Sequence, residues 1–212
     1  MRTTLRNLAA TCLVAFFSVN FKSSADAGPA TFQSGIYEGL MLAVSLNGEL
    51  EGFFREEQGE GVTKTCAFFL HGRAAGAATV PITTWNQQAF PGSLAPKADG
   101  VQLAIPQGRD HPGCGLVLLP AIAQGIMLDR TLRTTWSALE RIAVRRAYLH
   151  ARPADGHTLR TYTVQGDVVG ITGRTSGWIR IELVSNEGGS VTGWIQETEA
   201  RPLTPQEPAG QR

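Results

Sequence analysis

The stretch from Ala147 to Ala200 reads AYLHARPADGHTLRTYTVQGDVVGITGRTSGWIRIELVSNEGGSVTGWIQETEA. Within it the pair Gly-Trp occurs twice, at Gly177-Trp178 and Gly193-Trp194, each time inside a short run of alternating apolar and polar residues. A period of two is typical of β-strands, and Gly-rich turns separate these runs. Short strands joined by such turns predict a small β-barrel.

This segment, about residues 146–200, resembles the bacterial SH3 (SH3b) family. Four pieces carry the resemblance in the order that the family has them: Leu149-His150-Ala151-Arg152 followed by Pro153, Gln165–Val169, Ser176–Ile181 and Thr192–Ile195. The family implies an SH3-like barrel, and many of its members attach proteins to the cell envelope. The resemblance therefore implies that this unit binds a peptidoglycan-related ligand, a peptide or a protein partner.

The first 27 residues are typical of a signal peptide. Arg2 and Arg6 precede an apolar run, Leu8–Phe17, that is too short to span a bilayer. Ala25-Asp26-Ala27 then supplies small residues at the −3 and −1 positions of a cleavage site. We expect cleavage after Ala27 and a periplasmic or secreted protein; an uncleaved anchor and a lipoprotein acylated at Cys12 are the alternatives.

Export leaves two cysteines in the mature chain, Cys66 and Cys114, because Cys12 departs with the signal peptide. An even number of cysteines in an oxidising compartment favours a Cys66–Cys114 disulfide. The alternative is a cysteine nucleophile that acts with His71 or His111. In a strand-like run Cys66 lies on the same face as Phe68 and Leu70, which favours the bridge.

The rest of the mature chain also predicts strands, so the expected fold class is all-β. We expect an antiparallel β-barrel or sandwich over residues 28–142, an SH3-like barrel over 143–200 packed rigidly against it, and a disordered tail over 201–212. Asn47-Gly48 predicts a type I′ hairpin turn after one long strand that begins at Ile36. The further expected strands are Leu50–Arg55, Thr63–Leu70, Val80–Trp85, Val101–Ile105 and Gly115–Leu119, with one helical turn at Trp136–Ile142.

Strand periodicity also indicates a binding surface. Trp178 shares a strand face with Arg180 and Glu182, while Tyr148 and His150 share a face of the opening strand. If the two faces meet, Tyr148, His150, Trp178 and Arg180 form an aromatic and polar patch suited to sugars or peptides. The alternative is that Trp178 folds over a barrel edge and caps the core. We interpret Trp194 as structural, because Gly193 before it suggests close packing.

No motif in the chain predicts catalysis, a metal or a cofactor. The four histidines and two mature cysteines lack metal-ligand spacing, and no P-loop, dinucleotide or Gly-x-Ser-x-Gly signature occurs. Glutamates 49, 51, 56, 57 and 60 surround a hairpin and are expected to be a solvated edge rather than a hydrolytic pair.

The charge balance excludes a typical nucleic-acid binder. The chain has 19 Lys and Arg against 18 Asp and Glu, and removal of Arg2, Arg6, Lys22 and Asp26 leaves it close to neutral. We therefore expect an exported, non-catalytic envelope protein without metal or cofactor. A periplasmic inhibitor or immunity protein against a cell-wall hydrolase is the main alternative, and a cysteine-dependent envelope hydrolase is the third.

Overall fold

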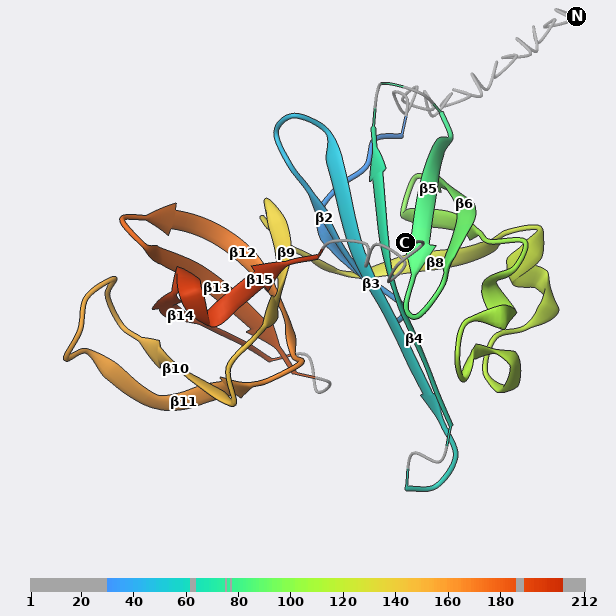
Figure 1. Cartoon of the computed structure of the whole chain (residues 1–212). Helices are drawn as coiled ribbons and strands as arrows, with labels where there is room; N and C mark the ends of the chain where they lie inside the picture. Colours follow the sequence, from blue (N-terminus) through green and yellow to red (C-terminus); the bar gives the residue numbers. More distant parts are fainter. Residues whose placement is uncertain (1–29, 62–63, 75, 77, 186–188, 204–212) are drawn as a thin grey trace, which may run out of the picture.

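The computed structural model describes residues 30–61, 64–74, 76, 78–185 and 189–203 and is all-β in those parts (Figure 1). The expected signal peptide and most of the expected tail lie outside the described residues. Eight strands close into a barrel: β1 Gly35–Tyr37, β2 Leu40–Val44, β3 Glu49–Gln58, β4 Lys64–Arg73, β5 Val80–Trp85, β6 Ala89–Pro96, β7 Gly100–Ala104 and β8 Ile126–Arg133. The choice between barrel and sandwich is thereby settled for the first unit.

The second sheet has seven strands in the order β11-β10-β14-β13-β12-β9-β15. Their bounds are β9 Ala138–Ile142, β10 Arg146–His150, β11 Thr158–Val164, β12 Val168–Thr175, β13 Trp178–Val184, β14 Ser190–Gln196 and β15 Ala200–Pro202. Short 3₁₀-helices η1 Gly108–Asp110, η2 Cys114–Leu116 and η3 Pro120–Ala123 follow β7, and residues such as Cys114 and Ile122 pack in the barrel core; η4 Glu197–Glu199 precedes β15. Within the described ranges, no helix is both long and apolar enough to cross a bilayer.

The barrel forms because its long strands alternate between a buried and a less buried face. In β3 and β4 the inward side chains include Phe54 and Phe68, which stack with ring centroids 4.9 Å apart. Their outward neighbours Phe53 and Phe69 also stack, at 5.1 Å, and they face the second sheet. The same pair of strands thus contributes to the barrel core and to the contact between the two sheets.

The first expected strand is divided by a turn that we did not predict. Glu38 and Gly39 have φ values of 39° and 92°, and Tyr37 pairs with Leu40, which is the geometry of a two-residue type I′ hairpin. The Asn47-Gly48 hairpin is present, but its predicted turn type is wrong. Only Gly48 has a positive φ there, and its N–H donates to the Ser45 carbonyl, as in a type I turn followed by a bulge.

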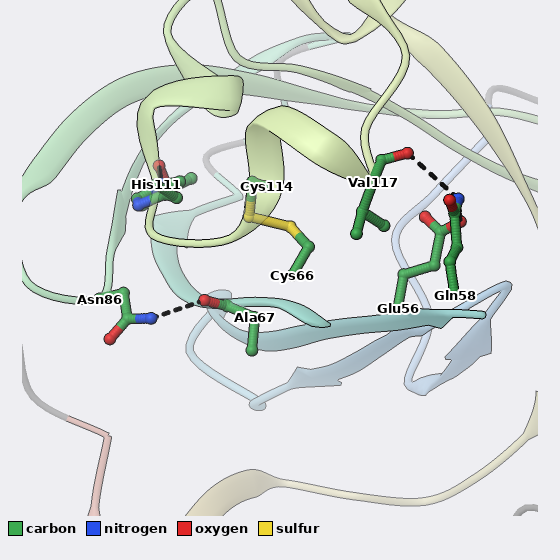
Figure 2. Close-up of a disulfide and its surroundings, with 9 residues drawn as sticks. Glu56, Gln58, Cys66, Ala67, Asn86, His111, Cys114 and Val117 are labelled. Carbon is green, nitrogen blue, oxygen red and sulfur yellow. Dashed lines mark hydrogen bonds between the residues drawn. A yellow bond between two sulfur atoms is a disulfide. The ribbon is translucent and has the colours of Figure 1, made fainter. Parts of the chain in front are cut away.

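The disulfide between Cys66 of β4 and Cys114 of η2 is confirmed, and both residues are fully buried (Figure 2). The expected strand Gly115–Leu119 is wrong, because the chain there forms η2 and then turns. Gly113, with φ 81°, lies so close to the Thr65 carbonyl that a Cβ would be 2.0 Å from the oxygen. The bridge and this contact hold the 3₁₀ segment against β4.

Three expectations about the second sheet and its ends are also wrong. Trp136–Ile142 is not a helical turn: β9 lies between β12 and β15, so the second sheet already begins at Ala138, before the expected boundary at 142/143. The expected tail also begins too early, since Arg201 and Pro202 belong to β15 and Leu203 is buried. The spacing of Leu139 and Ile142, three residues apart, is typical of one face of a helix, but pairing with β12 makes this segment a strand.

An apolar cluster joins the barrel to the second sheet. It combines Ala43 and Trp85 of the barrel with Trp136, Leu139 and Val168, and half-buried residues such as Phe53 pack around it. Glu51 on the outer face of β3 adds a polar contact, because its carboxylate accepts a hydrogen bond of 2.7 Å from the Leu139 N–H. The protein therefore has three apolar cores: one inside the barrel, one inside the second sheet and one between the two units.

Candidate ligand-binding face

The inner face of the second sheet is an apolar core, so of its two faces only the outer one is open to a ligand. Alternate residues of β10 and β13, including Leu149, Ile179 and Ile181, are completely buried in that core. Their neighbours along the same strands therefore point the other way. These outward residues include all four predicted site residues: Tyr148, His150, Trp178 and Arg180.

The structure brings His150 and Trp178 together. Their rings make an edge contact with centroids 4.8 Å apart, and the His150 Nδ1–H donates to the Ala154 carbonyl at 3.2 Å. Trp178 is half-buried and lies outside the apolar cluster that contains Ile179 and Ile181. The expected meeting of the two strand faces is thus present at this pair.

Tyr148 lies at the next outward position of β10 and forms a second aromatic pair. It faces Tyr162 of β11 with ring centroids 5.5 Å apart, and each side chain is 40% exposed. The Arg146 guanidinium lies 4.7 Å from the centroid of the Tyr162 ring, in a cation–π contact. Tyr162 and Arg146 were missed at the sequence level, although alternation along Thr158–Val164 could have placed Tyr162.

Arg180 and Trp194 occupy the middle of the face. Trp194 of β14 pairs in register with both His150 and Arg180, and it is half-buried. Our interpretation of Gly193 is confirmed, since a Cβ there would lie 2.8 Å from Leu149. Trp194 itself lies on the outward face and adjoins two of the predicted site residues.

Glycine at position 173 leaves the side of Arg180 open. Gly173 pairs with Arg180 across β12 and β13, and a Cβ at Gly173 would meet only the Arg180 Cβ, at 3.9 Å. No positive φ requires glycine at this position. Arg180 is exposed and therefore has room for a ligand group beside it.

The other half of the outer face is covered. Trp136 lies on Gly170 of β12, and its Nε1–H donates to the Glu182 carboxylate at 2.7 Å. Trp136 is only 1% exposed, and it belongs to the cluster shared with the barrel. The outer face is thus accessible over β10, β11, β14 and the start of β13, and covered over β9 and β12.

The glutamates around the first hairpin do not behave as one solvated edge. Glu49 pairs with His71 at 3.0 Å and with Arg73, and the Arg73 hydrogen bond holds its pKa below the ordinary value. Glu51, in contrast, lies at the contact between the sheets, where burial raises its pKa. Our expectation is therefore wrong for Glu51, whose pKa the neighbouring Glu140 carboxylate also raises and Arg174 lowers.

The most unusual titratable group lies near the disulfide (Figure 2). His111 is 1% exposed, stacks on Phe68 at 4.9 Å and meets the edge of Phe90 at 4.8 Å. Burial lowers its pKa to about 4. Thr84 donates its hydroxyl proton to the Phe90 carbonyl, so the 2.9 Å contact requires His111 Nε2–H to donate to Thr84. The Nδ1 atom has no hydrogen-bond partner.

Two further kinds of site can be compared with this face. An open groove of about 1100 Å³ runs between the barrel and the second sheet, lined by residues such as Met41, Phe53 and Leu183. The described part of the chain contains no cluster of three metal-ligating side chains.

Comparisons with protein-family models, curated proteins and solved structures find no match to this chain.

Proposed function

We propose that this protein is an exported, non-catalytic binding protein of the bacterial envelope, and that its second sheet is an SH3-like unit for a peptidoglycan-related ligand. The observation that carries the proposal is the accessible outer face of that sheet. It presents Tyr148, His150, Trp178 and Arg180 together with Trp194 and Tyr162. Half-exposed aromatic rings beside arginines suit the faces of sugar rings and the polar groups around them.

The resemblance to bacterial SH3 domains supports the envelope as the place of action. The four motif segments lie on β10, on the turn before β12, on β13 and on β14, in neighbouring parts of one sheet. The Cys66–Cys114 bridge is compatible with an oxidising compartment. It also leaves neither cysteine as a free thiol, which argues against a cysteine-dependent hydrolase.

One observation favours the alternative, an inhibitor of a cell-wall hydrolase. Leu116 and Leu119 are 70% and 71% exposed on the segment that the disulfide holds against the barrel. Exposed leucines on a rigid segment are suited to insertion into the pocket of a protein partner. In that case the barrel would supply the binding surface and the second sheet would be its support.

A paired capture experiment distinguishes the two functions. In the first arm the mature protein is incubated with purified peptidoglycan sacculi. In the second arm a periplasmic protein extract is passed over the immobilised mature protein. Binding of sacculi that Trp178→Ala weakens and Leu119→Ala leaves unchanged supports the proposal. Capture of a cell-wall hydrolase that depends on Leu119, without binding of sacculi, contradicts it and supports the inhibitor.

A further inference from the structure

The accessible outer face of the second sheet carries positive charge that the described structure does not neutralise. Arg146 and Arg180 are exposed on this face, and Arg152 and Arg160 are exposed in the adjoining loop and strand. None of the four is in an ion pair within the described ranges. From Arg145 to Val164 the chain has four arginines and a single acidic residue, Asp155, although the whole protein is close to neutral.

The acidic residues near this charge are fewer than the arginines and form no ion pair with them in the described ranges. Glu182, two positions after Arg180 on the same face of β13, keeps its charge but is held by the hydrogen bond from Trp136, and Asp155 lies in the adjoining loop. Glu140 and Glu197 are paired with Arg174 instead. The charge on the face is therefore complementary to an anion from outside the molecule.

The geometry of the arginines favours carboxylates that are attached to rings able to stack on aromatic side chains. A guanidinium presents a planar set of donors that matches a carboxylate with two parallel hydrogen bonds. Arg146 is held against the Tyr162 ring, and Arg180 lies in register with Trp194. A ligand unit can therefore stack on Trp194 and place its carboxylate on Arg180. Arg146 covers one face of the Tyr162 ring, and the adjoining Tyr148 ring, which is 40% exposed, is the aromatic surface open to a unit beside it.

The same face is poorly suited to an extended peptide. β10, β13 and β14 are interior strands, each hydrogen-bonded to a strand on both sides. Their backbone groups are therefore used within the sheet, and a peptide lying across them would find no main-chain partners. A polysaccharide needs no such ladder, and four strands at the usual spacing give it a surface about 14 Å wide.

From these contacts we infer that the outer face binds an acidic polysaccharide, whose ring carboxylates pair with Arg146 and Arg180 while its rings stack on Tyr148 and Trp194. This inference goes beyond the proposed function, because it assigns a ligand of a different chemistry to the same face.

Calorimetric titration of the mature protein with a linear oligogalacturonate tests the inference. Its methyl ester retains the sugar rings without the charge, and an oligoglutamate of equal length retains the charge on a peptide. We expect the oligogalacturonate to bind at least tenfold more tightly than either control. Arg146→Gln and Arg180→Gln should each weaken binding on the order of tenfold. Gly173→Glu, which puts a carboxylate beside Arg180 in open space, should weaken it similarly.

Arg55→Gln is the matched control, because it removes the same charge from a barrel arginine that pairs with Glu57. It should leave the affinity unchanged. Equal binding of the methyl ester, equal binding of oligoglutamate, unchanged affinity in both arginine variants, or no binding of oligogalacturonate would each overturn the inference. If the protein binds sacculi through Trp178 but does not bind oligogalacturonate, only this inference is refuted. If it binds oligogalacturonate but not sacculi, only the proposed peptidoglycan-related ligand is refuted.

Discussion

Replacing Gly170 by alanine should destabilise the protein far more than the same replacement at Gly173 in the same strand. A Cβ at Gly170 would lie 2.2 to 2.4 Å from three atoms of the buried Trp136 ring, whereas ordinary contact begins near 3.4 Å. The ring must therefore withdraw by about 1 Å from a closely packed position. At Gly173 the new Cβ would meet only the Arg180 Cβ, at 3.9 Å.

The magnitude follows from what Trp136 would lose. Overpacking a core costs about 1–3 kcal/mol, and loss of the Nε1–H bond to the Glu182 carboxylate costs about 1.5–3 kcal/mol more. The reduced freedom of the unfolded chain returns about 0.5–1 kcal/mol. We expect Gly170→Ala to lower the free energy of unfolding by about 2–5 kcal/mol, and Gly173→Ala to raise it by up to about 1 kcal/mol.

Urea unfolding of both variants, followed by tryptophan fluorescence and by circular dichroism, measures the difference. Coincident transitions from the two probes are needed before the free energies are compared. If Gly170→Ala and Gly173→Ala differ by less than about 0.5 kcal/mol, Trp136 does not lie on Gly170, and the described junction between the barrel and the second sheet is incorrect.

Three further predictions concern the rest of the molecule. Replacing both Cys66 and Cys114 by alanine should lower the free energy of unfolding by about 4 kcal/mol, from the chain entropy of a loop with a sequence separation of 48, and urea unfolding beside the oxidised parent measures it. Because burial lowers the folded-state pKa of His111 to about 4, the free energy of unfolding should fall as the pH drops from about 6.5 to 4, by on the order of 3 kcal/mol. Outside that pH range His111 should not change the free energy of unfolding. His111→Phe, which keeps the ring stack, should remove that part of the pH dependence, and an unchanged slope would show that His111 is not its source. Intact-mass measurement of protein from its native compartment should give a chain that begins at Gly28, in contrast to one that retains Met1 or is acylated at Cys12.

Local periodicity predicted what depends on local chemistry. The all-β class and the inward set Cys66, Phe68 and Leu70 follow from alternation, and Val80–Trp85 is confirmed without change as β5. The disulfide followed from counting the cysteines that remain when the predicted signal peptide is removed. Each of these predictions needs only neighbouring residues or a count of residues, which a single sequence supplies.

The elements that were wrong depend on pairing between distant segments. Glu38-Gly39 continues an alternating pattern, and only its pairing across β1 and β2 makes it a turn. Leu139–Ile142 becomes a strand because β12 and β15 lie on either side of it. Likewise, β6 and β8 were missed because Pro91, Pro96 and the polar positions of Ile126–Arg133 weaken the strand signal, and closure of the barrel overrides it.

The candidate face was predicted in part for the same reason. Alternation placed Tyr148, His150, Trp178 and Arg180 on outward positions, but it could not show which strands are neighbours. The strand order brings β11 and β14 beside β10, and so adds Tyr162 and Trp194 to the face. Glu182, which alternation also placed on the outward face, is half-buried there, and Trp136 from the segment before the sheet donates a hydrogen bond to its carboxylate.

The most direct test of the proposed face is Trp178→Ala, measured for binding to purified sacculi and for the free energy of unfolding on the same preparation. As a half-exposed anchor outside the core, Trp178 should contribute about 2 kcal/mol or more to affinity, roughly a thirtyfold loss on truncation, while stability changes by less than about 1 kcal/mol. A loss of about 3–5 kcal/mol of stability, with full binding by the fraction that remains folded, would show instead that Trp178 caps the core and that the ligand binds elsewhere.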